Sequence, residues 1–263
     1  MSTSHDKTGH PASIAEIPPM KPFLILQLRP EAEASDDEYQ AILAKGGLQA
    51  DQTHRIDLAK DDLPADLDLS NYAGVIVGGG PGCVSDPANK KSPLEKRMED
   101  AVMGLMPTIT AQDKPFMGCC YGIGILTHHL GGDVSKENYS EPVGLTTCQI
   151  TDDGKSDPML DGCAPVFDAF VGHKEAAQAL PPGCTHLLAS DACPFQMIRY
   201  KSNIYATQFH PEADAEGFEI RIRLYKDRGY FPPEDADRLI ALCRAADVTM
   251  PEKILRNFTA RYG

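Results

Sequence analysis

Three short apolar runs constrain the fold of this chain more than any other feature. Each run is followed by glycine or polar residues and then by a stretch with the spacing of an amphipathic helix, and the runs are KPFLILQL (21–28), AGVIVGGGPG (73–82) and KPFMG (114–118). Continuous apolar runs of this length are typical of strands buried on both faces. Strands that alternate with helices favour parallel pairing. The pattern therefore predicts an α/β fold, a three-layer sandwich with a mostly parallel central sheet.

The segments between these runs carry helix start and stop signals. Residues 35–47 begin with acidic side chains and end at Gly-Gly, and residues 92–106 begin with a serine N-cap followed by proline. A third helix is expected over 121–132, where the sequence also ends in Gly-Gly. From about 143 to 209, short strands separated by turn residues predict an antiparallel or mixed extension of the sheet. Helices are expected again after that region.

Composition divides the chain into three expected parts and excludes some classes of partner. Residues 1–20 are polar and predict a disordered leader, 21–225 form the main domain, and 226–263 form a C-terminal helical extension of the same domain. A net charge of -13 would repel nucleic acid and anionic membranes. No apolar run approaches the roughly 20 residues of a membrane span. We therefore expect no nucleic-acid partner and no membrane association.

The eight cysteines bear on compartment and metal binding. No two of them have the CxxC spacing of zinc-ribbon or thioredoxin sites, and the N-terminus lacks the apolar core of an export signal. Reduced thiols in the cytoplasm are therefore expected, most of them as small apolar side chains in the core. No cluster of potential ligands indicates a metal or an organic cofactor, and we expect none.

A pair of adjacent cysteines lies at a predicted strand-to-helix junction, in Gly118-Cys119-Cys120-Tyr121-Gly122. A nucleophile on a sharp turn crowds the residues two positions before and after it, so small residues are needed there. Cys120 has glycines at both of these positions, whereas Cys119 has Met117 and Tyr121. Cys120 is therefore the candidate nucleophile, at a helix N-terminus that favours the thiolate. A tight turn with two buried thiols remains the alternative for this pentapeptide taken alone.

A thiol nucleophile needs a base, and the base needs a group that orients it. The segment YATQFHPE (205–212) offers His210 and Glu212. In an extended segment residues i and i+2 point to the same side, so Glu212 could hold the His210 ring while Cys120 meets its other edge. A strand end with a solvated histidine and glutamate is the alternative for this short motif alone.

Acyl transfer also needs hydrogen-bond donors where the oxyanion forms. The glycine-rich segment after the second apolar run places the N–H of Gly80 as one candidate donor, and the N–H of Tyr121 is the second. A phosphate-binding loop is not supported, because GGGPGCVSD lacks the G-K-[ST] signature and the G-x-G-x-x-G spacing. A plain turn remains possible from these residues alone.

Together the three segments resemble the class I glutamine amidotransferases, the glutaminase domains found in GMP synthase, anthranilate synthase and carbamoyl phosphate synthetase. GGGPG is similar to the oxyanion loop of that family, GCCYG to its nucleophile elbow, and QFHPE to its terminal F-H-P-E. Their order and spacing also agree, over roughly residues 22–225. Among these relatives, the GMP synthase glutaminase and stand-alone homologues look nearest.

The resemblance implies a flavodoxin-like three-layer fold and a Cys-His-Glu amidohydrolase that uses no cofactor. It implies Cys120 as nucleophile, His210 as base and Glu212 as the group that orients it. The substrate would be glutamine or another γ-glutamyl compound, and the ammonia would pass to a separate synthetase subunit. A γ-glutamyl hydrolase or peptidase with the same triad is the alternative, and a non-catalytic regulatory subunit is a second.

Two further positions bear on the substrate. FVGHKEA (170–176) falls where relatives have a short histidine-containing strand near the site, so His173 is a candidate pocket residue, although a surface histidine on a turn is equally compatible. Many relatives have a substrate-contacting glutamine four residues after the cysteine, and this chain has Gly124. One polar partner for the amino-acid end of glutamine is therefore missing, a loss typically on the order of 1 kcal/mol or more.

Overall fold

The structure of the protein is a computed structural model that describes residues 20–263, so residues 1–19 of the predicted leader lie outside it. Its main sheet has nine strands in the order β2-β1-β3-β4-β11-β10-β9-β6-β7. Along the chain these are β1 (Phe23–Gln27), β2 (Thr53–Asp57), β3 (Val75–Val77), β4 (Phe116–Cys119), β6 (Glu141–Ile150), β7 (Val166–His173), β9 (Cys184–Ala189), β10 (Met197–Tyr200) and β11 (Ile204–Thr207). The short strands β5 (Val134–Ser135) and β8 (Ala176–Ala177) pair with each other.

The sheet has a parallel half and an antiparallel half. Strands β2, β1, β3, β4 and β11 are parallel to their neighbours. From β11 outward, β10, β9, β6 and β7 pair antiparallel. The predicted α/β fold with its mixed extension over 143–209 is thus confirmed. The parallel half corresponds to the apolar runs, because strands covered on both faces can be apolar throughout.

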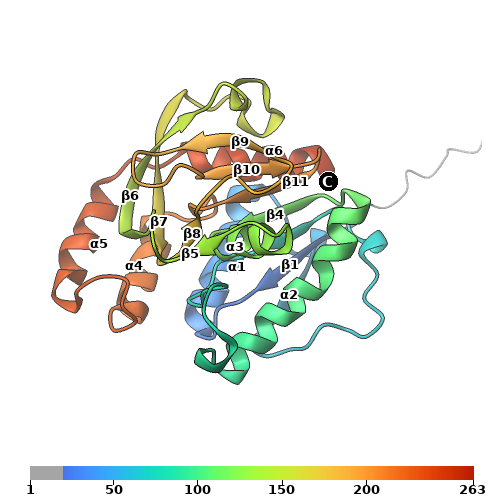
Figure 1. Ribbon diagram of the computed structural model, residues 1–263, viewed down its shortest axis with the longest axis horizontal. Helices are drawn as coiled ribbons and strands as arrows, with labels where there is room; N and C mark the ends of the chain where they lie inside the picture. Colours follow the sequence, from blue (N-terminus) through green and yellow to red (C-terminus); the bar gives the residue numbers. More distant parts are fainter. Residues whose placement is uncertain (1–19) are drawn as a thin grey trace, which may run out of the picture.

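Helices cover both faces of the sheet (Figure 1). On one face α2 (Pro93–Gln112) and α3 (Tyr121–His129) pack around a core that includes Val102 and Ile125. On the other face α1 (Ala32–Gly46) and α6 (Met250–Tyr262) enclose a core with Ile42 and Phe258. A third cluster joins α4 (Ala215–Tyr225) and α5 (Ala236–Ala245) to the antiparallel strands. This is the predicted three-layer arrangement.

Several element boundaries differ from the sequence predictions. Helix α2 continues to Gln112 instead of ending near 106, although it contains Pro107. Pro107 is exposed, so water can replace the hydrogen bond that the proline removes. Strand β2 was not predicted, because its side chains are only partly buried at the sheet edge and lack an apolar run. Both α5 and α6 fall in the region predicted as a helical extension, 226–263.

The parallel half aligns the carboxyl ends of β3, β4 and β11 at one edge of the sheet. Val77 pairs with Gly118, and Thr207 pairs with Cys119. The glycine-rich loop, Cys120 and the His210 segment leave these three strand ends, so the topology brings the predicted motifs to one place. Within residues 20–263, no helix has the length and apolar character needed to cross a membrane.

Candidate active site

Cys120 is the single residue that connects a strand to the helix that follows it. Strand β4 ends at Cys119 and helix α3 begins at Tyr121, and Cys120 between them has φ 52° and ψ -88°. A positive φ is uncommon for a residue with a side chain and is often found at functional turns. The Cys120 N–H donates to the carbonyl of Thr207 at 2.8 Å, which ties the turn to β11. Cys119, in contrast, is a fully buried strand residue.

The two glycines that flank Cys120 have different steric roles. A Cβ at Gly118 would lie 2.9 Å from the carbonyl carbon of Gly122 and 2.9 Å from a ring carbon of Phe116. A Cβ at Gly122 would meet nothing closer than the Val77 carbonyl oxygen at 3.8 Å, an ordinary contact. From the sequence alone, the same crowding is expected at both positions. The crowding in fact falls on Gly118, because the helix turns its Gly122 backbone toward it.

His210 and Glu212 form a buried pair just after β11. The Nδ1 of His210 lies 2.8 Å from Oε1 of Glu212, and the same oxygen accepts a hydrogen bond from Nη2 of Arg221 at 3.1 Å. Glu212 is fully buried and His210 is 4% exposed. A carboxylate can only accept from Nδ1, so the proton of the neutral ring lies on Nδ1 and Nε2 is left as the basic nitrogen.

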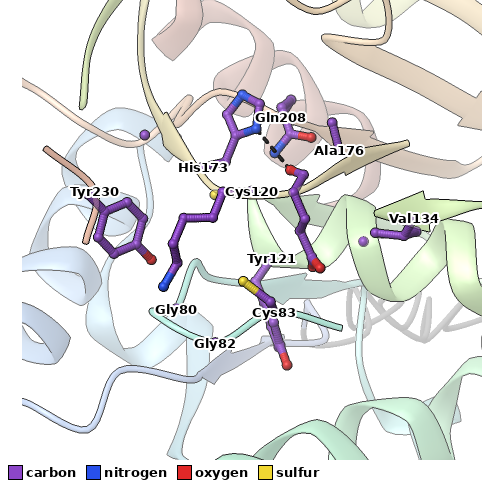
Figure 2. Close-up of a pocket in the computed structure, with 14 residues that line it drawn as sticks. Gly80, Gly82, Cys83, Cys120, Tyr121, Val134, His173, Ala176, Gln208 and Tyr230 are labelled. Atoms are coloured by element: carbon purple, nitrogen blue, oxygen red, sulfur yellow. Dashed lines mark hydrogen bonds between the residues drawn. The ribbon is translucent and has the colours of Figure 1, made fainter. Parts of the chain in front are cut away.

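Cys120 and His210 line the same cavity. Gly80 from the glycine-rich loop lines it too, together with Arg29 and Arg221. The fold thus brings together the nucleophile, base and oxyanion-loop residues that were predicted from separate motifs. A second cavity meets the first at Cys120, Gly80 and two other shared residues, and it is the one shown in Figure 2.

Burial controls the protonation of the candidate dyad. It raises the pKa of the Cys120 thiol to about 12, although the Arg29 guanidinium acts in the opposite direction. Burial also lowers the pKa of His210, and the Glu212 carboxylate offsets this only in part. The resting pair is therefore a neutral thiol and a neutral imidazole. Desolvation of the enclosed sulfur therefore opposes the thiolate that the helix N-terminus is expected to favour.

Glu212 remains ionised in the same surroundings. Burial acts to raise its pKa, but His210 and Arg221 outweigh burial and hold the pKa well below the usual range for glutamate. The carboxylate is thus charged at every pH at which the histidine could act as a base. It can orient His210 and stabilise the imidazolium that forms when the ring takes up a proton.

The buried ion pair of Arg29 and Glu38 holds the glycine-rich loop in place. Glu38 accepts hydrogen bonds from Nε of Arg29 at 2.7 Å and from the N–H of Gly79 at 3.0 Å. Arg29 is 3% exposed and Glu38 is fully buried. A Cβ at Gly80 would lie 2.9 Å from the carbonyl oxygen of Leu28, so the loop packs directly on the end of β1. The Gly79 N–H is thereby occupied, whereas the Gly80 N–H donates no hydrogen bond to any residue within 20–263.

Three charged residues at the site, Arg29, Glu38 and Arg221, were not predicted from the sequence. One signal for Arg29 was available, since it follows the first apolar run and so lies at the same sheet edge as the other motifs. Glu38 and Arg221 lie in amphipathic helices, where a charged residue normally predicts a solvent-facing position. Their burial becomes evident only when the two helices pack beside the loop.

His173 lies on the wall of the cavity in Figure 2, as the sequence suggested, but its ring nitrogens are engaged elsewhere. Nδ1 is 2.9 Å from the carbonyl oxygen of Glu175, and Nε2 is 2.9 Å from a carboxylate oxygen of Glu141. A substrate would meet only the carbon atoms of the ring. Together with Cys193, His173 and Glu141 form the single group of three potential metal ligands found in the described part of the chain.

Glu175 occupies the space beside Gly124. A Cβ at Gly124 would lie 3.1 Å from a Glu175 carboxylate oxygen. That carboxylate accepts hydrogen bonds from the N–H of Val84 and from the N–H and hydroxyl of Ser85. A longer side chain at position 124 would have to displace this anchored carboxylate, which accounts for the glycine.

Comparison with known proteins points to one family. The family model for glutamine amidotransferase class-I matches residues 35–222. The GMP synthase [glutamine-hydrolyzing] of Thermosipho africanus is 31% identical over 153 residues, which are 58% of this chain and 26% of that protein. The enzyme of the same name from Neisseria meningitidis serogroup C is 27% identical over 162 residues, 61% of this chain and 27% of that protein. The chain thus spans about a quarter of the length of these relatives.

Solved structures share the fold at lower sequence identity. A glutamine amidotransferase from Thermotoga maritima aligns with a TM-score of 0.71 and 20% identity, covering 92% of this chain and 98% of that one. The glutamine amido transferase from Methylobacillus flagellatus gives a TM-score of 0.68 and 21% identity over 93% and 94% of the two chains. The matched family region includes the elbow, the glycine-rich loop and the His-Glu segment. On these grounds the chain belongs to the class I glutamine amidotransferase family.

Proposed function

We propose that this protein hydrolyses the side-chain amide of glutamine through a thioester on Cys120. The observation that carries the proposal is that Cys120, at a strained turn, shares one cavity with His210, whose Nδ1 is held by Glu212. The thiol and the imidazole are both neutral at rest. A proton transfer from sulfur to Nε2 can therefore accompany the attack on the amide carbon.

The proposed reaction has two halves. As Sγ of Cys120 bonds to the amide carbon, its proton moves to His210, and the carbonyl oxygen becomes an oxyanion. The resulting imidazolium gives that proton to the amide nitrogen, the C–N bond breaks, and ammonia leaves behind a thioester. His210 then takes a proton from water as the water attacks the thioester. Glutamate leaves, and the proton returns to the sulfur of Cys120.

The N–H groups of Gly80 and Tyr121 are the proposed oxyanion donors. Tyr121 is the first residue of α3, where backbone N–H groups have no partner within the helix. Gly80 lines both cavities beside Cys120. Two backbone donors of this kind typically contribute several kcal/mol, with about 3 to 4 kcal/mol for one donor in a well-studied protease.

The ammonia is proposed to pass to a separate synthetase. In water at neutral pH it would be protonated to ammonium, which is not a nucleophile. The relatives that this chain matches are GMP synthases, and the matched part is about a quarter of each. An ATP-using partner in the cytoplasm, docked near the elbow and ordering the loop around Gly80, would then raise a low basal activity.

A γ-glutamyl hydrolase remains a second candidate, favoured by one observation. The leaving nitrogen must lie on the side of His210, where the aromatic rings of Phe218 and Tyr225 stand in the cavity wall. Aromatic rings in this position would pack against the organic substituent of a leaving amine.

The two adjacent cysteines provide the test of the proposed function. Cys120→Ala should abolish glutamate release and labelling by glutamine-analogue electrophiles, whereas Cys119→Ala should retain both with some loss of stability. The purified chain is assayed on glutamine and on γ-glutamyl dipeptides, alone and after pull-down from its native lysate. Fast dipeptide cleavage with no gain from any co-purifying protein would replace the ammonia-supply proposal with the hydrolase. Thioester formation by the Cys120→Ala chain would overturn the assignment of the nucleophile.

A further inference from the structure

Lys174 brings a positive charge without an ion-pair partner to the cavity that contains Cys120. Lys174 is the only lysine or arginine among the residues that line this cavity. The nearby carboxylates are engaged by other groups: Glu175 by the 84–85 backbone, Glu141 by His173, and Asp86 by Lys136. Within residues 20–263, Lys174 forms no salt bridge at all.

Tyr230 fixes the position of this ammonium group. The Nζ atom of Lys174 lies 4.5 Å from the centroid of the Tyr230 ring, a cation–π distance. The Tyr230 hydroxyl donates to the carbonyl oxygen of Pro81 at 3.2 Å, so the ring is anchored to the glycine-rich loop. Figure 2 shows Tyr230 at one end of the cavity, with Cys120 and Cys83 facing its interior. The Lys174 ammonium group thus lies over a ring that is bonded to the glycine-rich loop.

Gln208 supplies a second polar group without a partner. It is 3% exposed and lines the same cavity, yet its side-chain amide makes no hydrogen bond to any described residue. The fully enclosed side-chain atoms that lack a partner within residues 20–263 include none of Gln208, so its amide is open to the cavity. An amide in this position is suited to a ligand that enters the cavity.

The cavity has no side chain at position 124 that could bind the amino-acid end of the substrate. Lys174 and Gln208 offer a cation and an amide carbonyl instead, on the wall of a space next to the nucleophile. A free α-amino acid carries one carboxylate and one ammonium group, which match these two groups in charge and in hydrogen bonding. Glu175 is unsuited to this role, since its carboxylate already accepts three hydrogen bonds.

We infer that Lys174 binds the α-carboxylate of the glutamyl substrate and that the Gln208 carbonyl accepts from its α-ammonium group. This inference rests on the proposed hydrolysis at Cys120. It makes the protein selective for substrates with a free α-carboxylate, and it assigns that selectivity to residues outside the elbow. Tyr230, in the region that follows α4, then acts as a positioning residue for the Lys174 ammonium.

The experiment compares two substrates that differ only at the α-carboxylate, glutamine and glutamine α-amide. Ammonia release is measured for the wild type, Lys174→Met and the matched control Lys136→Met, which removes an equal charge from a lysine paired with Asp86 outside the cavity. A hydrogen bond between charged groups is worth about 10- to 100-fold in affinity. The wild type and Lys136→Met should prefer glutamine by about this factor in kcat/KM. Lys174→Met should lose the preference through a higher KM and leave the α-amide unaffected.

Binding to a Cys120→Ser chain, measured by calorimetry, separates this inference from the proposed function. Weaker binding of glutamine but not of its α-amide in Lys174→Met supports the inference, even if turnover without a partner is slow. Equal binding of the two ligands by a chain with Lys174 intact would overturn the inference while leaving glutamine hydrolysis standing. An equal loss on both substrates in Lys174→Met would also overturn it, because that pattern indicates a structural role. Hydrolysis of neither substrate, with binding still selective, would count against the proposed function instead.

Discussion

The contact between Gly118 and Gly122 makes a sharp prediction about the nucleophile elbow. In Gly118→Ala the new methyl group would lie 2.9 Å from the carbonyl carbon and 3.0 Å from the Cα of Gly122. Both are backbone atoms of α3, and the third neighbour, the ring of Phe116 at 2.9 Å, is fully buried. No flexible side chain can move aside, so β4 and the start of α3 must separate by several tenths of an ångström.

The expected magnitude follows from the tight packing. Adding a methyl group to a close-packed core typically lowers the free energy of unfolding by about 1–3 kcal/mol. The shift also moves Cys120, which lies between the two glycines, relative to His210. A displacement approaching 1 Å costs about 100-fold in rate in well-oriented active sites. We therefore expect Gly118→Ala to lose about 10- to 100-fold in kcat/KM as well as stability.

Gly122→Ala is the matched control. It adds the same methyl group on the other side of Cys120, where the nearest atom is 3.8 Å away. Alanine is also favoured over glycine within a helix by up to about 1 kcal/mol. Stability should be unchanged or slightly raised, and activity should stay within a few-fold of the wild type. Urea denaturation and glutaminase kinetics measure the two effects. Equal losses in both variants, or a loss confined to Gly122→Ala, would refute the steric reasoning.

Three other outcomes are expected. Glu38→Ala should lower the free energy of unfolding by about 3–5 kcal/mol in denaturation experiments, since it leaves the buried Arg29 guanidinium unpaired; a change below 1 kcal/mol would show that the pair is not desolvated. Glu212→Gln should reduce kcat less than His210→Ala, because it weakens the orientation of the ring without removing the base, and equal activity of His210→Ala and wild type would reject the triad. Burial lowers the pKa of His210 below 6.5, so the ring takes up its inactivating proton only in more acidic solution. The acid limb of the pH profile of kcat/KM should therefore lie below pH 6.5. An acid limb above that value would contradict the buried neutral imidazole.

The sequence by itself determined the parallel half of the fold and the three motifs at its edge. The reason is that both depend on local order. A run such as 21–28 is apolar because the strand is covered on both faces, and glycines follow where the chain must turn sharply. The order of Cys120, His210 and Glu212 along strand ends then predicts that they meet, because parallel strands place their carboxyl ends at one edge. Their arrangement in the structure agrees with that expectation.

Tertiary structure alone decided how the site is supported and how its groups are charged. Arg29 reaches Tyr225 across 196 positions, and Tyr230 reaches Pro81 across 149. No periodicity within a short segment encodes such contacts, because each depends on how whole helices pack against the sheet. The same packing encloses the Cys120 sulfur and raises its pKa, whereas the local motif predicted a thiolate. Protonation depends on the total desolvation of a buried group, and that quantity is set only when the distant elements close around it.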